Sequence, residues 1–452
     1  MTGPIVGIIA NPVSARDIRR IISHAGNLQD RPHAKLLEDH ERDLIAGEET
    51  FITRYEQWAQ SRQGIYYNAP YARSAAWQLL SAAFTDAVFI PRGNGPEYCN
   101  LFSMTIGDSG SGKTSSRKLW VSAMHELFPE DPQWNLGSNA SPNALHEKLL
   151  ERDDKFSCFN SDEAHGWFKQ VNGQQWSDGI YENIASYYDG DVPPMLRTSN
   201  RDISGKSARS FFNMFMMGTL KGEHSLSNVL DRSMFLSGLL ARFIWYIGEE
   251  RDMTEESMVE TDGNADYVRL GYEPVVRQWV AEFNDTKKRL RQKHKRKMIP
   301  VSLTRPALDR LSRAKWDIVR ENRSNPNWEI LEPSLRNRFG SNIRKAATLL
   351  AAEEGMDEVE LKHVLLALEA AEEWLSAVLL MAEKISDSEW KRLVDEVHDF
   401  ISSKSRVSLE AVHRRFASRR SRDLQEHIDA LKSQGRVFEK MDSGKKWLMT
   451  NE

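Results

Sequence analysis

The sequence is poor in cysteine and has no long uninterrupted run of apolar residues. The two cysteines among its 452 residues, Cys99 and Cys158, give neither a disulfide framework nor the spacing of a metal site, which fits a reducing compartment. No stretch of about 18 apolar residues occurs, so we expect no membrane-spanning helix. The N-terminus lacks the basic-then-apolar order of a signal peptide. These absences predict a cytoplasmic protein without a membrane partner.

The chain also lacks a strong excess of charge of either sign. Its 61 Lys and Arg residues stand against 65 Asp and Glu residues, which gives a formal charge of −4 and a pI near 6.4. This balance excludes a uniformly basic nucleic-acid-binding protein, so any basic surface must be local. The length corresponds to about two to four domains.

What the sequence does contain is a glycine-rich motif between a predicted strand and a predicted helix. Residues 107–114 (GDSGSGKT) fill every position of GxxxxGK[ST], after an apolar-leaning run at 101–106 and before a helix-competent segment at 115–127. Glycines let the backbone curl until its N–H groups face an anion, and the helix N-terminus adds partial positive charge. The motif predicts a phosphate-binding loop; the alternative is a glycine-rich surface turn. The residues expected to bind ATP are Gly107, Asp108, Ser109, Gly110, Ser111, Gly112, Lys113, Thr114 and Ser115.

A second segment, 156–163 (FSCFNSDE), supplies the carboxylates that ATP hydrolysis needs. It predicts a strand that ends in Asp162 and Glu163, about 50 residues after Lys113. We expect Lys113 to neutralise the outer phosphates, and Thr114 and Asp162 to hold Mg2+. Glu163 would orient and activate the attacking water. A solvated surface position is the alternative for both carboxylates.

The next core strand is predicted at 211–217 (FFNMFMM). Thr219 lies beyond its tip, where its hydroxyl either senses the γ-phosphate or is satisfied locally. The loop before this strand either grips nucleic-acid phosphates in a central channel or is a plain solvated turn. Its basic residues are Arg201, Lys206 and Arg209.

An arginine interrupts the apolar segment 237–248 (SGLLARFIWYIG), which predicts a helix end that runs into a strand. Arg242 needs an anionic partner, because burying an unpaired guanidinium is expensive. The γ-phosphate of ATP on a neighbouring subunit would serve, which is the arginine-finger arrangement. A core carboxylate of its own subunit would serve equally.

Residues 251–300 join an acidic linker to a basic segment. Eight of the eleven residues at 287–297 (KKRLRQKHKRK) are Lys or Arg, which indicates a solvated helix face or a phosphate-contacting patch. Residues 301–388 are helical almost throughout and predict a lid. Arg336 and Arg344 share one face there if the helix runs unbroken through Gly340. Either they reach a bound nucleotide or they lie on the helix surface.

Residues 389–452 have the order of a winged helix. Three short helices, at 390–402, 409–416 and 422–433, precede two alternating strands at 436–449. Such modules bind duplex DNA through the third helix and the wing, although many serve as protein contacts. The residues expected to bind nucleic acid are Arg414, Arg415, Arg419, Arg420, Lys445 and Lys446.

The first 29 residues resemble the start of the ATP–NAD kinase-like family. A strand at 5–10, an Asn-Pro turn and a helix at 15–24 carry the resemblance. The Gly-Gly-Asp-Gly motif of that family is absent, so we expect a short β–α structural segment and not a second nucleotide site. Residues 30–97 predict a helical N-terminal region in front of a nucleotide-binding core at 98–250.

From residue 98 onward the order of motifs resembles two related groups. GDSGSGKT, the SDE strand, the YYDGD turn with Arg197, and GLLARF are similar to a P-loop ATPase family of phages, plasmids and integrated elements that is often joined to primase domains. GLLARFIWYI followed by SLRNRFGSNIRKAATLLAA and a winged helix resembles minichromosome-maintenance-type AAA+ hexameric helicases. The second resemblance implies an arginine finger at Arg242 and a second sensor at Arg336, with Arg344 one register further on. Thr219 departs from the usual Asn, and no primase or zinc motif occurs in the chain.

Together these features predict an α/β protein with a P-loop, AAA+-like parallel-sheet ATPase core, a helical N-terminal region, a helical lid and a C-terminal winged helix. The predicted function is an ATP-driven helicase or translocase that acts on DNA as a homo-hexameric ring in the replication of a mobile element. ATP and Mg2+ are the expected cofactors, and any priming would come from a separate primase. The alternative is an ATP-switched assembly factor, such as a helicase loader, transposition regulator or anti-phage defence ATPase.

Overall fold

A computed structural model gives the fold of the chain. It describes residues 35–93, 95–138, 140–172, 177–194, 204–220, 222, 224–249, 274–404, 406–417, 421–433, 436–442 and 445–450. The chain divides into two compact units, unit 1 at residues 1–380 and unit 2 at 381–452. This division is coarser than the six expected segments, because the boundaries expected near residues 97, 250 and 300 all fall inside unit 1. The segment 1–29, most of the acidic linker, Arg201, Arg419 and Arg420 lie outside the described residues.

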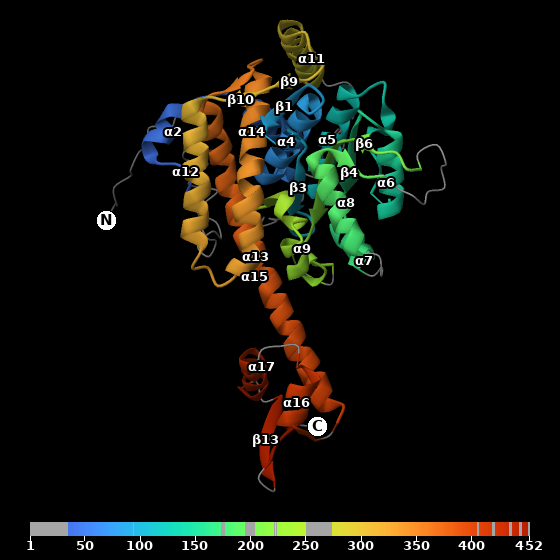
Figure 1. Cartoon of the computed structure of the whole chain (residues 1–452), viewed down its shortest axis with the longest axis vertical. Helices are drawn as coiled ribbons and strands as arrows, with labels where there is room; N and C mark the ends of the chain where they lie inside the picture. Colours follow the sequence, from blue (N-terminus) through green and yellow to red (C-terminus); the bar gives the residue numbers. More distant parts are fainter. Residues whose placement is uncertain are drawn as a thin grey trace, which may run out of the picture. The chain divides into compact units, whose positions relative to one another are not determined.

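A four-stranded sheet forms the centre of unit 1, and each strand is parallel to its neighbours (Figure 1). The strand order is β4-β7-β3-β8, and a parallel bridge from Asn135 to Cys158 adds to the β4 edge. Every position of the four strands is buried, as expected of parallel strands that read as near-continuous apolar runs. The mixed α/β class and the predicted strands are confirmed. These strands are β3 (Phe102–Ile106), β4 (Phe156–Ser161), β7 (Phe211–Gly218) and β8 (Phe243–Ile247).

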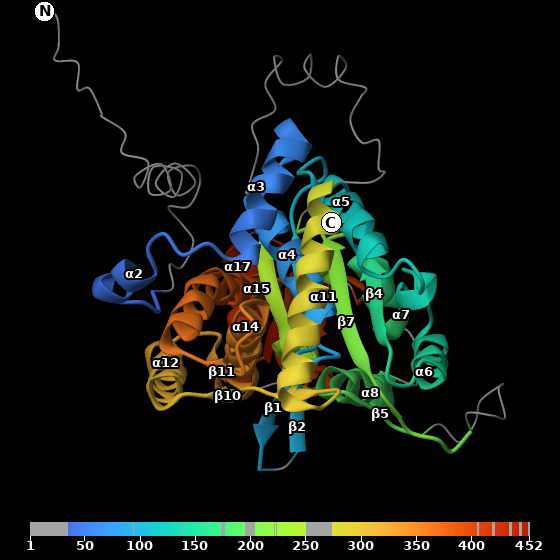
Figure 2. The same cartoon turned by 90° about the horizontal axis from the view of Figure 1, so that it is seen from above.

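The helices that follow β3 and β4 lie toward the β4 side of the sheet (Figure 2). The helix α6 begins as predicted, because the Ala144 N–H donates to the Ser141 hydroxyl and Pro142 occupies the first turn. A short antiparallel pair, β5 and β6, precedes β7. The bounds are α5 (Lys113–Leu127), η2 (Pro132–Trp134), α6 (Pro142–Glu151), α7 (Ala164–Asn172), α8 (Ser177–Asp189), β5 (Asp191–Val192) and β6 (Ala208–Arg209). Between β7 and β8 lie η3 (Leu226–Asn228), α9 (Arg232–Leu236) and η4 (Leu240–Arg242).

The helix α4 (Ala69–Phe84) packs directly across β3, β7 and β8. A row of fully buried polar side chains on α4 and at its C-cap, which we name the α4 seam, hydrogen-bonds to groups in residues 99–105 over 2.8–2.9 Å. The seam consists of Ser74, Gln78, Ser81 and Thr85. The helical N-terminal region is therefore part of the core. Before α4 come α2 (Asp39–Ile45), α3 (Phe51–Gln63) and the 3-10 turn η1 (Gly64–Tyr66).

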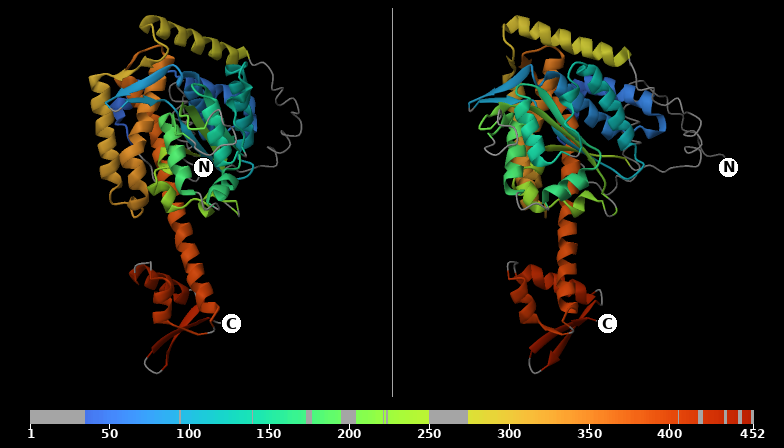
Figure 3. Two further views of the ribbon diagram at one scale, coloured as in Figure 1. Left: turned by 45° about the vertical axis from the view of Figure 1, so that its right-hand side comes forward. Right: turned by 90° about the vertical axis from the view of Figure 1, so that its right-hand side faces the viewer.

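The remaining helices of unit 1 gather on the side of the sheet away from α6 (Figures 1 and 2), except α11, which lies across α4 and α5 (Figure 3). Gly340 does not break its helix, because α13 continues through the π-helical segment η5 into α14. The helices are α11 (Pro274–His294), α12 (Arg305–Asn322), α13 (Trp328–Glu332), η5 (Pro333–Phe339), α14 (Gly340–Glu353) and the first part of α15 (Leu361–Ser402). The short strands are β1 (Val88–Arg92), β2 (Gly95–Tyr98), β9 (Ile299–Pro300), β10 (Ser302–Leu303) and β11 (Glu358–Val359).

Unit 2 combines the end of α15 with two helices and a three-stranded antiparallel sheet in the order β12-β14-β13. The helix predicted at 390–402 is thus the last part of α15. Unit 2 has its own apolar core, which includes Val397, Val412, Ile428 and Leu448. Its other elements are β12 (Val407–Ser408), α16 (Leu409–Arg415), α17 (Ser421–Ser433), β13 (Val437–Asp442) and β14 (Lys445–Thr450). In the part of the chain that the structure describes, no helix is both long and apolar enough to cross a membrane.

Candidate functional site

The parallel sheet brings three predicted site segments to one edge. The carboxyl ends of β3, β4 and β7 lead into the loop 107–112, the Asp162–Glu163 pair and Thr219. Because β7 lies between β3 and β4, the loop and the two carboxylates are separated by two strand spacings, about 10 Å. That separation leaves room for a phosphate group and a water molecule between them.

The loop 107–112 has a backbone that requires glycine. Gly110 and Gly112 have φ values of 80° and 91°, in the left-handed region, and Gly112 is the N-cap of α5. A Cβ at Gly112 would lie 2.1 Å from the carbonyl oxygen of Tyr66, and one at Gly107 would lie 1.6 Å from the hydroxyl oxygen of Tyr71. Conformation therefore favours glycine at Gly110, close packing favours it at Gly107, and both favour it at Gly112.

Lys113 begins α5 and points back into this loop. Its ammonium group donates hydrogen bonds to the carbonyl oxygens of Gly107 and, over 2.7 Å, of Asp108. Burial lowers the pKa of Lys113, and the nearby Asp108 carboxylate offsets part of that effect. The cation thus lies where the loop N–H groups and the α5 N-terminus would hold an anion. The neighbouring Thr114 side chain is exposed.

The N-terminus of α4 supports the loop through its N-cap residue Asn68 and through Tyr71 of its first turn, contacts that sequence reasoning missed. The Tyr71 hydroxyl lies 2.7 Å from the Ser111 hydroxyl oxygen. The Asn68 side-chain amide donates to the carbonyl oxygens of Ser111 and Glu249, over 3.4 and 3.2 Å. No local sequence pattern connects these residues to a loop some 40 positions away, so only the tertiary structure reveals the contact.

The two carboxylates after β4 are exposed, and Arg117 ties one of them to α5. The Arg117 side chain donates to the Asn160 amide oxygen over 2.9 Å and pairs with Asp162 at 3.4 Å. Arg117 is one turn beyond Thr114, so Asp162 lies near the N-terminal turn of α5. Sequence reasoning also missed Arg117, whose partner is 45 positions away.

A divalent cation at this edge would need ligands beyond the protein. Among the described residues, no cluster of three or more His, Cys, Asp or Glu side chains is placed to hold a metal ion. Mg2+ usually retains waters and uses one or two carboxylates together with substrate phosphates. The exposed Thr114 hydroxyl and the Asp162 carboxylate fit that requirement only with a bound nucleotide.

Thr219, at the end of β7, lies beside the loop. It follows Gly218, whose carbonyl oxygen accepts a hydrogen bond of 3.1 Å from the Gly107 N–H. A parallel bridge to Ser225 and a 2.8 Å hydrogen bond from the Leu226 N–H hold the Thr219 backbone in place. The structure therefore brings loop, carboxylates and threonine together.

Arg242 lies at the opposite edge of the sheet, because η4 precedes β8. Its side chain is only 6% exposed; it donates to the Gly238 carbonyl oxygen over 2.6 Å and pairs with Asp189 at 3.5 Å. Burial lowers the pKa of Arg242, and the nearby Arg338 acts in the same direction. Of the two partners predicted for Arg242, the structure contains the carboxylate of its own subunit, beside which the guanidinium is buried.

The two lid arginines are not brought to the loop. Arg336 lies on η5, is half exposed, and pairs with Glu332 at 3.0 Å. Arg344 lies on α14, 3.7 Å from Glu97, a residue that precedes β3. Arg344 therefore lies at the amino edge of the sheet, and within its own subunit β3 separates it from the loop 107–112.

The predicted nucleic-acid contacts divide between the two units. In unit 1, Lys206 is exposed, whereas Arg209 pairs with Asp154 at 3.4 Å and lies 5.7 Å from the centre of the Tyr98 ring. Both precede β7 and so lie at the amino edge. In unit 2, the basic side chains that the structure describes are exposed on α16 and β14: Arg414, Arg415, Lys445 and Lys446.

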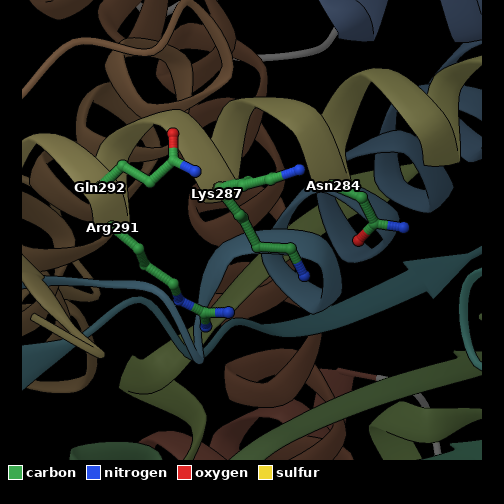
Figure 4. Close-up of a pocket in the computed structure, with 5 residues that line it drawn as sticks. Asn284, Lys287, Arg291 and Gln292 are labelled. Carbon is green, nitrogen blue, oxygen red and sulfur yellow. The ribbon is translucent and has the colours of Figure 1, made fainter.

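Two cavities in the described part of the chain lie away from the loop. One of about 660 Å3 runs along α5 and the segment 128–135, with Arg117 among its lining residues. Another of about 360 Å3 is lined by α11 alone (Figure 4). Neither of these two cavities includes a residue of the loop 107–112 among its lining residues.

Comparison with known proteins adds no relative to this picture. No protein-family model matches the chain, and no curated protein matches its sequence. The function therefore has to be argued from the carboxyl edge of the sheet and from the surfaces of the two units.

Proposed function

We propose that this protein is an AAA+-type ATPase that couples ATP hydrolysis to translocation along DNA or to its unwinding. The observation that carries the proposal is the shared edge of the sheet, where the glycine loop at the N-terminus of α5 lies beside Thr219 and opposite Asp162 and Glu163. An anion cradle, a carboxylate pair and a polar strand end are the parts that phosphoryl transfer requires.

Each residue at this edge has a role in the proposed reaction. The loop N–H groups bind the phosphates, and Lys113 exchanges its carbonyl partners for phosphate oxygens. Thr114 and Asp162 would hold Mg2+, which when bound neutralises charge on the phosphate oxygens. Glu163 accepts the proton of the attacking water, and Thr219 orients the reacting phosphate.

The DNA-binding part of the proposal rests on unit 2. Its helices, its antiparallel sheet and the exposed cations of α16 and β14 fit a winged helix that contacts phosphates. The exposed Lys206, in the segment before β7, would add a contact in unit 1. The resemblance to hexameric helicases supports a homo-hexameric ring that acts in replication of a mobile element together with a separate primase.

One observation favours a second function, an ATP-switched assembly factor such as a helicase loader, a transposition regulator or an anti-phage defence ATPase. Arg242 pairs with Asp189 inside its own subunit and so does not complete a neighbouring active site in this conformation. Such a factor would change partners with its nucleotide state and would not unwind DNA processively.

The test measures ATP hydrolysis and the unwinding of forked DNA by the same preparation. Lys113→Ala should abolish both, because the loop then lacks its cation. Lys118→Ala is the matched control, since Lys118 is an exposed lysine on the same helix and outside the motif. Hydrolysis that ignores DNA, with assembly that follows nucleotide state, would favour the second function. Failure to bind ATP would overturn both.

A further inference from the structure

The C-terminal half of α11 and the turn after it form a strongly basic surface, which we name the α11 ridge. It contains the eight Lys and Arg residues of 287–297, and most of their side chains are exposed. The predicted ATPase site uses none of them. The ridge consists of Lys287, Lys288, Arg289, Arg291, Lys293, Lys295, Arg296 and Lys297.

The opposite face of α11 explains why these cations face outward. Its apolar side chains recur at helical spacing and are buried: Val276, Trp279, Phe283 and Leu290 are each at most 4% exposed. The helix is therefore held to unit 1 by its apolar face. Because its large apolar groups are already covered, α11 does not fit a membrane surface, which such a helix would enter with those groups.

The ridge carries more positive charge than its neighbours neutralise. Asp86 pairs with Lys287 at 3.7 Å and with Arg291 at 3.2 Å. Two further carboxylates, Asp357 and Asp154, pair with Lys293 and Lys297 at 2.9 and 3.0 Å. Asp285 of α11 also lies three and four positions before Lys288 and Arg289. Within the described residues, four carboxylates thus lie beside eight cations, so a net excess of about four positive charges remains.

The residues that line a cavity on the ridge are all polar or charged, and the methylene groups of their side chains form part of its surface. Its volume is about 360 Å3, and the spacing of its lining residues, i, i+3, i+4, i+7 and i+8, places them on one side of α11. Figure 4 shows Lys287 and Arg291 pointing to the same side of the helix. No aromatic or aliphatic side chain lines the cavity, so it offers no anchor for a peptide. The lining residues are Asn284, Lys287, Lys288, Arg291 and Gln292.

Lys295 adds an independent observation from the backbone. It directly follows α11 and has a φ of 51°, in the left-handed region where glycine or asparagine is the usual residue after a helix. A lysine is strained there, and glycine would close the helix at lower cost. The chain thus keeps a cation at a position where conformation favours a residue without charge.

We propose that the α11 ridge binds the sugar–phosphate backbone of a nucleic acid, at a site separate from unit 2. From Asn284 to Gln292 the helix rises about 12 Å, the length of about three phosphates along one strand. Lys and Arg ammonium and guanidinium groups, with Asn and Gln amides beside them, are the side chains that contact phosphate and sugar oxygens. The inference does not depend on ATP hydrolysis.

The first test measures binding of a fluorescent DNA duplex to the full chain without nucleotide, at several salt concentrations. Lys288→Gln with Arg296→Gln should lower the slope of log Kd against log salt by about 1.5 to 2, because each lost phosphate contact on duplex DNA removes about 0.9. The control is Arg313→Gln with Arg323→Gln, a pair of exposed arginines on and just after α12, which should leave the slope unchanged. Equal slopes for wild type and the ridge variant would overturn the proposal.

The variant Lys295→Gly distinguishes the loss of a positive charge from a loss of folded structure. It should leave the melting temperature unchanged or raise it, because glycine relieves the left-handed backbone, while it weakens DNA binding. Unchanged DNA affinity in this more relaxed variant would count against the proposal.

Lysine acetylation, read by mass spectrometry, locates the contact. DNA should protect Lys288 and Lys295 and leave the exposed Lys35, in the segment before α2, reactive. Equal protection by poly-glutamate at the same charge concentration would overturn the nucleic-acid assignment in favour of an acidic protein partner. The same protection in Lys113→Ala would show that the ridge acts whether or not the proposed ATPase function holds.

Discussion

At the scale of single residues, the glycine loop depends on two separate properties of Gly112. Its φ of 91° disfavours any side chain, and the Tyr66 carbonyl oxygen occupies the space that a Cβ would need. Gly137 shares only the first property, with a φ of 82° and nothing within 4 Å of a built Cβ. The two positions therefore separate backbone strain from collision.

We expect Gly137→Ala to cost about 1 kcal/mol of unfolding free energy, the usual price of a left-handed alanine. Gly112→Ala should cost more and should also abolish ATP binding, because the loop must move away from Tyr66. Urea unfolding and binding of a fluorescent ATP analogue measure the two effects. ATP affinity that survives in Gly112→Ala would contradict a role for this loop in nucleotide binding.

Arg242 gives a second test at this scale. Because its guanidinium is buried against Asp189 and Gly238, Arg242→Ala should lower the unfolding free energy by about 1–3 kcal/mol. Hydrolysis per folded molecule should persist. A double-mutant cycle with Asp189→Asn measures the pair itself. Unaltered stability with hydrolysis lost would instead assign Arg242 to a neighbouring active site.

At the scale of elements, three helices distant in sequence meet at Arg54 on α3. Its guanidinium pairs with Glu282 of α11 at 2.9 Å and with Glu353 of α14 at 3.0 Å. Burial raises the pKa of Glu353 to about 7, and the hydrogen bonds from Phe51 and Arg54 only partly oppose that effect. The next residue, Glu354, behaves oppositely: burial acts to raise its pKa, but Lys362 and His363 hold it below its ordinary value.

This difference predicts opposite pH dependences for two adjacent glutamates. The folded state holds a proton on Glu353 that the unfolded chain releases above about pH 4.5, so its contribution to stability is present below pH 4.5 and is lost as pH rises through 7. Between pH 4.5 and 7.5, the unfolding free energy of wild type should fall by up to about 3 kcal/mol relative to that of Glu353→Gln. Glu354 stabilises the folded state above its ordinary pKa, and this contribution disappears as pH falls. The unfolding free energy of wild type relative to Glu354→Gln should therefore decrease toward low pH, opposite to the trend for Glu353.

Urea unfolding at a series of pH values from 3 to 7.5 measures both glutamates, since all other groups cancel between variant and wild type: Glu353 above pH 4.5 and Glu354 below it. Parallel stability curves for wild type and Glu353→Gln would contradict the raised pKa.

Elements whose signal is local could be predicted from the sequence. The apolar runs of β3, β4 and β7 and the Ser141 cap of α6 lie within a few residues of the features that define them. The partners of Arg242 and Arg344 could not be predicted, because Asp189 and Glu97 lie 53 and 247 positions away in the chain. Gly340 indicated a break, but packing of the flanking turns keeps the helix continuous as a π segment.

At the scale of the whole molecule, the two units have separate apolar cores. Ile428→Ala should therefore lower the unfolding free energy of unit 2 by about 2–5 kcal/mol, because it leaves a cavity at a fully buried position. In calorimetry, only the transition temperature of unit 2 should fall. Ile343 of unit 1 is equally buried, so Ile343→Ala should lower the transition temperature of unit 1 instead. A single transition that moves in both variants would show that the units unfold together.

The α4 seam determines how this protein can be shortened for experiments. A fragment that starts at residue 98 would lack α4, which covers β3. The hydroxyls of Ser103 and Thr105 and the amide of Asn213 would then lose their hydrogen-bond partners on α4. Each orphaned group costs about 1–3 kcal/mol, and a domain has only about 5–15 kcal/mol to lose. The same fragment would also lack Tyr71, so a working ATPase fragment has to include the whole of α4.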